Sequence, residues 1–371
     1  MARAARTVLG AALGPCLAVG PEDAGHPLPD RRGLRAAEAA ETMVQRLGRD
    51  DLLLVLLSGG ASAILPAPAP GLRLEDKTRT TRLLMHAGAD IAELNTVRKH
   101  LSRLKGGRLA HLASPAHVVC LALSDVVGDD LSVIGSGPTV PDPTTYADAC
   151  AVVERHGLRR RMPTRAWRHL DLGRRGRRHE TPKPGDPLLR RVQTEVIGGG
   201  RTALDAAARE ARRLGWAPQI LTSRLQGEAR EVGRVLAAVL RERAGDGRGG
   251  CLLAAGETTV TVRGRGVGGR NLELAVAAAA DLDGVRDVLV AAFATDGRDG
   301  ASDAAGGLVT GRTVARARAL DLAPIPTFLA ENDAEAFLAP LGDLIVTGPT
   351  GTNVADLVVM LAGPGRAQRG L

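Results

Sequence analysis

Two apolar runs that each end in a polar, glycine-containing turn constrain this chain more than any other feature of its sequence. Leu52–Leu57 contains only Leu and Val, and His117–Leu123 is a second run of the same kind. Such runs are typical of strands buried on both faces, as in parallel sheets covered by helices. Helix-period stretches at 75–92 and 96–112 lie between them. We therefore predict an α/β fold with a doubly wound sheet.

The second half of the chain predicts a separate, smaller α/β domain. The 371 residues are enough for two domains, and prolines and a glycine at 181–187 interrupt the pattern. We place the first domain at 1–187 and the second at 188–371. In the second domain the predicted strands are 194–197, 219–222, 251–255, 258–263, 288–294, 344–347 and 356–361, with helices at 202–214, 228–243 and 271–280.

The charge and composition exclude several classes of protein. The net charge is +8, but ten arginines lie between Arg155 and Arg178 against Asp171 alone, so the basicity is local. We interpret this segment as a solvated linker. Only six residues are aromatic, which argues against stacking on nucleic-acid bases. The chain contains no long apolar segment and no export signal, and its four cysteines are typical of buried thiols, so we expect a cytoplasmic protein without membrane or nucleic-acid partners.

Glycine loops at the ends of predicted strands are the first candidates for chemistry. The loop Ser58-Gly59-Gly60, followed by Ser62, offers backbone N–H groups to a phosphate or carboxylate, although a simple tight turn explains it equally well. The chain has four lysines among 49 basic residues, and Lys105 precedes two glycines. Lys105 is therefore a candidate point charge, in reach of Arg98 and Arg108 on one predicted helix face. The alternative is a solvated basic face.

Acidic residues follow the predicted strands as well. Asp125 and Asp129 come after 117–123, where a Mg²⁺ ion with phosphate oxygens would relieve their repulsion. Helix capping by one of them is the alternative. After the predicted strand 288–294, either Asp296 or Asp299 could bind a metal or accept a hydroxyl proton. The alternative is that they only form an Asp-Gly turn.

Residues 264–269 match the G-x-G-x-x-G pattern of dinucleotide-binding proteins. The preceding segment 259–263 alternates polar and apolar residues, however, and this favours an exposed hairpin strand. The loop then presents Arg270 and Asn271 at a helix start. With Glu257 they form a candidate site for anions and hydroxyl groups.

At these residues the sequence resembles the glycerate 2-kinase family with a C-terminal MOFRL domain, some members of which were labelled hydroxypyruvate reductases. The similarity lies in segments 24–27, 56–60, 97–102, 105–110, 136–143, 256–260, 268–271, 295–297 and 347–353. The resemblance implies a Rossmann-like, doubly wound larger domain with a smaller α/β domain. It also implies transfer of the γ-phosphoryl group of ATP to the 2-hydroxyl of D-glycerate with Mg²⁺. Ala61 departs from the family pattern, which usually has a third glycine there.

The resemblance also implies roles for individual residues. The catalytic residues would be Glu257, Arg270, Asp296, Asn353 and Lys105. ATP would be bound by Ser58, Gly59, Gly60, Ser62, Ser136, Gly137, Gly351 and Thr352, and the metal by Asp125 and Asp129. A homodimer is left open. An NAD(P)-dependent hydroxypyruvate reductase that uses the G-x-G-x-x-G pattern is the enzyme alternative. We also expect that the first βα units of the family are missing, and a catalytically impaired, N-terminally truncated remnant is therefore the second alternative.

Overall fold

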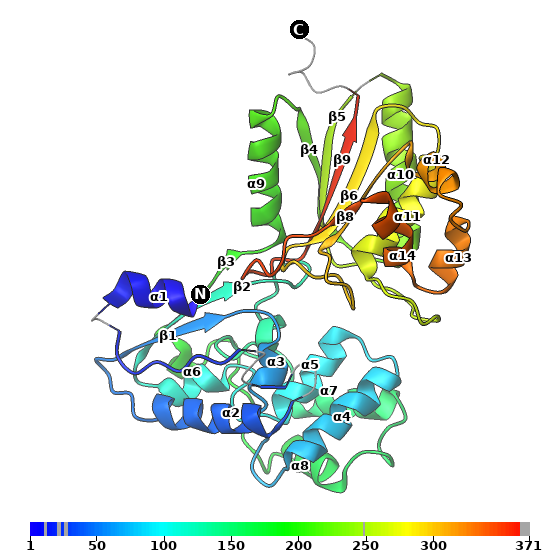
Figure 1. Ribbon diagram of the computed structural model, residues 1–371. Coiled ribbons are helices and arrows are strands. Elements are labelled where there is room, and N and C mark those ends of the chain that lie inside the picture. Colours follow the sequence, from blue (N-terminus) through cyan, green and yellow to red (C-terminus); the bar gives the residue numbers. More distant parts are fainter. Residues whose placement is uncertain (11–12, 21–23, 26–28, 248, 364–371) are drawn as a thin grey trace. The chain divides into compact units, whose positions relative to one another are not determined.

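The computed structural model describes residues 1–10, 13–20, 24–25, 29–247 and 249–363, and it divides into two compact units. Unit 1 comprises Met1–Ala122 and Asp130–Ile197, and unit 2 comprises Leu123–Asp129 and Gly198–Leu371. Each unit contains a sheet with helices (Figure 1), so the predicted α/β class with two domains is confirmed. Residues 26–27 of the first family segment lie outside the described residues.

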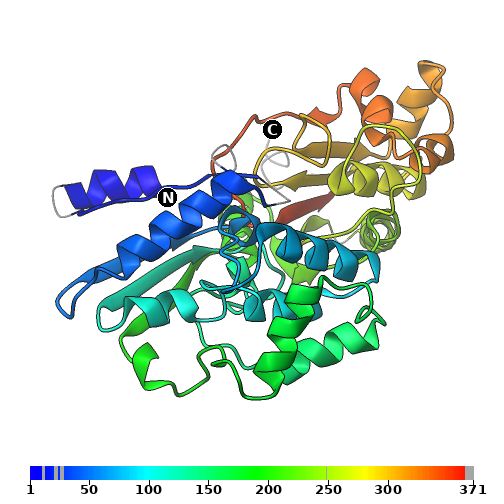
Figure 2. The ribbon, with the colours of Figure 1, turned by 90° about the horizontal axis from the view of Figure 1, so that it is seen from below.

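Unit 1 contains a three-stranded sheet in the order β1-β2-β3. The predicted strands 52–57 and 117–123 are β1 (Leu52–Leu57) and β2 (His117–Leu123), which pair in parallel, and β3 is Val192–Gly198. Apolar residues of α2 and α6 pack against β1 and β2, and Figure 2 shows α2 running beside these strands. The helices of unit 1 are α1 (Ala2–Leu9), α2 (Arg31–Val44), α3 (Ala61–Ile64), α4 (Leu74–His86), α5 (Ile91–His100), α6 (Arg108–Ala113), α7 (Tyr146–Arg155) and α8 (Thr164–Arg174), with 3-10 turns η2 (Ile134–Ser136) and η3 (Pro187–Leu189).

The helix predicted at 96–112 is wrong, because the chain breaks into α5 and α6. Residues 101–107 form an irregular turn between them, with Gly106 and Gly107 at φ +60° and +79°. This left-handed conformation is readily available only to glycine, and it ends the helical path. Arg98 and Arg108 are therefore not on one helix face.

The linker predicted at 155–178 is also wrong. α8 lies within it, and Ala166, His169 and Leu170 are buried. Leu170 belongs to a core shared with α4, α5 and α7. The guanidinium groups of Arg159 and Arg174 lie 5.3 and 5.8 Å from the centre of the Trp167 ring. The number of arginines concealed a narrow apolar face, which is enough to hold a helix against a core.

Unit 2 contains a mixed six-stranded sheet in the order β4-β5-β9-β6-β7-β8. Alternate side chains of β5 enter cores on opposite faces, one formed with α10 and α11 and the other with α9. Figure 1 shows α9 on one side of the sheet and α10 and α11 on the other. The strands are β4 (Pro218–Leu225), β5 (Gly250–Gly256), β6 (Val288–Ala294), β7 (Gly306–Thr310), β8 (Leu344–Ile345) and β9 (Asp356–Ala362), and the helices are α9 (Gly200–Arg213), α10 (Ala229–Gly245), α11 (Arg270–Asp281), α12 (Thr313–Ala319), α13 (Ile325–Ala330) and α14 (Ala334–Leu338), with the 3-10 turn η4 (Ala339–Leu341).

The strand pairing in unit 2 differs from the predicted hairpin. Residues 258–263 contribute only an isolated bridge, between Thr259 and Glu228, and β5 pairs instead with β4 and β9. β9 is antiparallel to both of its neighbours, and Asp356 is level with Gly256 of β5 and Ala294 of β6. The end of β5, the end of β6 and the start of β9 therefore meet at one edge of the sheet.

The cysteines follow the prediction at three of four positions. Cys120, Cys150 and Cys251 are buried free thiols, whereas Cys16 is exposed in an irregular segment after α1. Across the residues that the structure describes, helices that combine enough length and apolar character to span a bilayer are absent.

Candidate active site

Arg270 is the centre of a charged cluster in unit 2. It is the first residue of α11, and its Nε and Nη2 donate to the two carboxylate oxygens of Asp356 at 2.5 and 3.1 Å. Its Nη1 donates to Oε1 of Glu257 at 2.6 Å. Burial disfavours the charged guanidinium, but the bonds to these two carboxylates outweigh burial and raise the pKa of Arg270. The guanidinium is held by residues at the ends of two neighbouring strands.

The acidic side of this cluster carries more charge than Arg270 neutralises. Partial desolvation, together with the negative charges of Asp356 and Asp125, raises the pKa of Glu257 despite its ion pair with Arg270. Asp125 Oδ2 accepts a hydrogen bond from Nδ2 of Asn353 at 3.4 Å. The predicted residues Glu257, Arg270, Asn353 and Asp125 therefore gather in unit 2. Asp356 was missed, since the sequence marks it only as the first residue of a strand.

Asp129 is placed differently from Asp125. It has a positive φ of 56°, and its carboxylate lies over the start of α9, where a Cβ added to Gly199 would be 2.6 Å from Oδ1. Among the residues described, no group of three or more His, Cys, Asp or Glu side chains is arranged to hold a metal ion.

Asp299 and Asp296 have distinct surroundings although they lie three residues apart. Both oxygens of Asp299 accept N–H groups of α11, from Asn271 at 3.2 Å and Leu272 at 2.8 Å, so this carboxylate caps the helix that carries Arg270. Burial raises the pKa of Asp299 to about 6. Asp296 is half-buried, and its Oδ1 accepts the Arg298 N–H at 3.0 Å. No described residue donates a hydrogen bond to its Oδ2.

The loop 347–353 is fixed to the end of β6. Thr350 Oγ1 donates to the Thr295 carbonyl at 2.6 Å, and the Thr350 N–H donates to the Asp296 carbonyl at 3.2 Å. The predicted nucleotide-binding residues Gly351 and Thr352 are exposed in this loop. The loop thus brings Asn353 and Asp296 to the same edge of the sheet as Arg270.

The G-x-G-x-x-G loop is used for packing within the protein. The N–H groups of Arg263 and Gly264 donate to Oδ1 of Asn332, and those of Gly266 and Val267 to Glu331 and Asp333. A Cβ at Gly264 would lie 2.2 Å from the Glu331 backbone. Because its amides and its glycines already serve the protein's own chain, this loop does not offer the pyrophosphate cradle of a dinucleotide site.

Unit 1 holds the second group of predicted residues. Ser136 Oγ donates to Oδ1 of Asn95 at 2.9 Å and is bonded to Ser62 Oγ, and Ser136 has a positive φ of 62°. Lys105 Nζ donates to the Gly135 carbonyl at 3.4 Å. Gly60, with φ +80°, precedes α3, and Ser58 is exposed. Ser62, Ser136 and Lys105 are therefore brought together, with Gly137 in the same turn.

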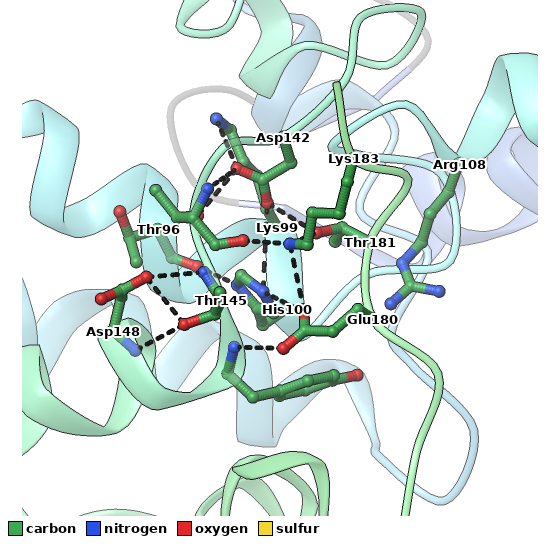
Figure 3. Close-up of polar contacts among 12 residues, drawn as sticks. Thr96, Lys99, His100, Arg108, Asp142, Thr145, Asp148, Glu180, Thr181 and Lys183 are labelled. Carbon is green, nitrogen blue, oxygen red and sulfur yellow. Dashed lines mark hydrogen bonds and ion pairs between the residues drawn. The ribbon is translucent and has the colours of Figure 1, made fainter. Parts of the chain in front are cut away.

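A buried polar network fixes the turn that carries Lys105 (Figure 3). The fully buried Asp142 accepts hydrogen bonds from Lys99 at 3.4 Å and Thr181 at 3.0 Å. His100 Nδ1 donates to the Thr96 carbonyl at 2.7 Å, and its Nε2 is hydrogen-bonded to Oε2 of Glu180 at 3.2 Å. A Cβ at Gly106 would lie 3.2 Å from Asp142 Oδ2. A side chain at position 106 would therefore crowd the carboxylate of Asp142.

Comparisons with known proteins agree with this architecture. Residues 15–171 match a family model described as a domain of unknown function, DUF4147, and residues 250–356 match the MOFRL family. The glycerate 2-kinase of Pyrococcus horikoshii is 40% identical over 344 residues, covering 91% of this chain and 77% of that protein. Human glycerate kinase is 41% identical over 390 residues, covering 92% and 73%.

A solved structure is similar over nearly the whole chain. The crystal structure of glycerate kinase from Thermotoga maritima superposes with a TM-score of 0.87 at 39% identity, covering 98% of this chain and 88% of that one. The two family segments and this structural similarity extend over both units, and the cluster around Arg270 lies within the segment that matches the MOFRL family. The chain belongs to the glycerate 2-kinase family, as the sequence resemblance predicted.

Proposed function

We propose that this enzyme transfers the γ-phosphoryl group of ATP to the 2-hydroxyl of D-glycerate, with Mg²⁺ as cofactor. Family membership gives the reaction class, a phosphotransferase with an alcohol acceptor. The single observation that carries the assignment of residues is the ring of carboxylates around Arg270. Phosphoryl transfer requires mainly positioning and charge stabilisation, which such a cluster supplies.

A magnesium ion would relieve the excess of negative charge in unit 2. Asp125, Glu257 and Asp356 carry three negative charges against the one positive charge of Arg270, and burial, followed by the charges of Asp356 and Asp125, raises the pKa of Glu257. Mg²⁺ is usually held by one or two carboxylates together with phosphate oxygens and water. Asp125 and Glu257 would hold the ion, with Asp129 as the further predicted ligand, and the bound ion would neutralise charge on the phosphates.

Arg270 and Asp296 have separate roles in the proposed reaction. Arg270 stabilises negative charge on the transferring phosphoryl group, since Asp356 fixes the plane of the guanidinium. Asp296 accepts the proton of the glycerate hydroxyl, because its Oδ2 has no hydrogen-bond donor among the described residues. Asp299 is a poorer base, since the N–H groups of α11 occupy both of its oxygens. Asn353 orients Asp125.

The predicted residues of unit 1 complete the proposal. Ser58, Gly59, Gly60, Ser62, Ser136 and Gly137 of unit 1 are proposed to bind ATP, and Gly351 and Thr352 of unit 2 stay predicted nucleotide-binding residues. Lys105 supplies a positive charge to an anionic group of a substrate. A cytoplasmic location and a homodimer stay predictions.

A coupled assay tests the reaction directly. We expect ADP release that depends on D-glycerate and Mg²⁺, and no oxidation of NADH with hydroxypyruvate. Asp296→Asn should lower kcat by about 10² or more, the usual contribution of a positioned base. Asp303→Asn is the matched control, because Asp303 lies in the same loop and its side chain is 92% exposed. NADH oxidation without ADP release would show that the protein is a reductase and that the proposed kinase function is wrong.

A further inference from the structure

Lys77 on α4 is a buried cation that the sequence did not single out. Only 4% of its surface is exposed, and its Nζ donates to the backbone carbonyl of Pro66. Lys105 is equally buried, at 2%, and also reaches only a carbonyl, that of Gly135. A carbonyl satisfies one N–H of an ammonium group but does not neutralise its charge.

Arg98 on α5 adds a third positive charge to this pair. Its guanidinium is half-buried and forms neither a hydrogen bond nor an ion pair with any described residue. Lys77 and Lys105 likewise form no ion pair within the described part of the chain. Arg103, which also faces Lys77, is neutralised by Glu41 at 2.9 Å. The segment that Lys77 reaches through Pro66 is hydrogen-bonded to the chain just after α5, because the Ala69 N–H donates to the Leu101 carbonyl and the Arg103 N–H donates to the Ala67 carbonyl. Three cations therefore lie close to one another without a carboxylate partner among the described residues.

The electrostatics agree with this geometry. Burial, and then the charges of Lys105, Arg98 and Arg103, lower the pKa of Lys77 well below its ordinary value. Burial, and then Arg98, lower the pKa of Lys105 to about 7. Crowded unpaired cations are costly to the folded state, so such a cluster is typical of a place where a ligand supplies the missing negative charge.

Neutral donors lie beside the cations. The hydrogen of Ser136 Oγ is used on Asn95, so Ser62 is the donor in the Ser62–Ser136 bond. This leaves Nδ2 of Asn95 as a donor with no acceptor among the described residues, on the same helix as Arg98. Lys105 and Ser136 meet at the turn 135–137.

We propose that Lys77, Arg98 and Lys105, with the Asn95 amide, form a binding site for an oxyanion of a substrate, either the carboxylate of the acceptor or a phosphate of the nucleotide. The identity of the ligand rests on the proposed kinase function, but the binding of an oxyanion does not. Lys77 and Arg98 thus join Lys105 in this site, and all three side chains would bind the same anionic group. An oxyanion bound there accepts charge-assisted hydrogen bonds from ammonium and guanidinium groups.

The test compares Lys77→Met with Arg82→Met. Methionine keeps the length and the apolar stem of Lys77, and Arg82 is an exposed cation on the same helix. We expect Lys77→Met to weaken binding of inorganic phosphate or D-glycerate, measured by calorimetry, by about ten- to a hundredfold. Arg82→Met should change it by less than twofold. Thermal stability of Lys77→Met should equal or exceed that of the wild type, because an unpaired buried charge is removed.

The source of the oxyanion is read from the steady-state kinetics. A rise in KM for D-glycerate alone assigns the site to the acceptor carboxylate, and a rise in KM for ATP alone assigns it to a phosphate. Binding at pH 8 should also take up protons, seen as a buffer-dependent heat, since an anion raises the lowered pKa of Lys105. Lys105→Met should reduce this uptake, and the double variant Lys77→Met/Lys105→Met should abolish it, because the pKa of Lys77 is lowered as well.

The failure of this inference is distinguishable from failure of the proposed function. If ADP is formed from ATP and D-glycerate but Lys77→Met leaves anion affinity and both KM values unchanged, the oxyanion site is wrong and the kinase stands. A Lys77→Met protein that is destabilised with unchanged affinity also excludes the site, because Lys77 then only fastens the Pro66 carbonyl. If phosphate binding depends on Lys77 but no ADP is formed, the oxyanion site is supported and the proposed kinase function is wrong.

Discussion

The guanidinium of Arg270 and the carboxylate of Asp356 form a two-point ion pair, with N–O distances of 2.5 and 3.1 Å, although 86 residues separate them in the chain. The side chain of Asp356 is only 7% exposed and that of Arg270 is 32% exposed. The pair joins the first turn of α11 to the first residue of β9. Its planar geometry holds the remaining nitrogen of Arg270 toward Glu257.

Replacement of Arg270 should therefore affect both activity and stability. We expect Arg270→Ala to lower kcat by about 10³ or more, as for other charge-stabilising arginines in phosphoryl transfer. It should also lower the free energy of unfolding by about 3 to 5 kcal/mol, since Asp356 is left buried and unpaired. The double variant Arg270→Ala/Asp356→Asn should recover much of the stability while staying inactive. A stable, active Arg270→Ala enzyme would remove Arg270 from the proposed mechanism.

The buried Asp299 should make stability depend on pH between about 4 and 6. Its pKa rises from an ordinary 3.8 to about 6 in the folded protein, so the folded state binds the proton more tightly than the unfolded state. The contribution of Asp299 to stability is then most favourable below pH 4, falls as pH rises through this window and is level above it. The two pKa values correspond to at most about 3 kcal/mol. Urea unfolding of Asp299→Asn at several pH values should lose this slope, whereas Asp303→Asn should keep it.

Two glycines of α10 should respond in opposite ways to alanine. A Cβ at Gly233 would lie 2.3 Å from the Leu274 carbonyl oxygen, so Gly233→Ala must push α10 away from α11. We expect a loss of about 1 to 3 kcal/mol or more. Gly245, at the end of the same helix, has no atom within 4 Å of such a Cβ. Gly245→Ala should be neutral or stabilising by up to about 1 kcal/mol. Equal melting temperatures for the two variants would contradict this packing.

The arginine-rich helix α8 provides another matched comparison. Leu170 is fully buried, and Leu170→Ala should cost about 2 to 5 kcal/mol of unfolding free energy. Arg165 and Arg168 are exposed on the same helix, and their replacement by Gln should change stability by less than about 0.5 kcal/mol. If Leu170→Ala were as stable as the wild type, 155–178 would behave as the linker that its charge predicted.

The sequence by itself determined those features that are local in the chain. Leu52–Leu57 and 117–123 were recognisable as strands because an apolar run between turn residues has few other stable conformations. The family segments likewise marked Glu257, Arg270 and Asn353 as functional candidates. α8 was not recognised, because its apolar face is narrow and is stabilised only by packing against residues of α4, α5 and α7.

Tertiary structure decided which of these residues act together. Asp356 became a partner of Arg270 only because β9 inserts antiparallel between β5 and β6, a pairing that no local pattern encodes. The same fold separated Asp299, which caps α11, from Asp296, whose second oxygen receives no hydrogen bond from the described residues. It also brought Lys77 to Lys105 and Arg98 from other elements. Charges interact through space rather than along the chain, so the electrostatics of a site follow from strand order and helix packing.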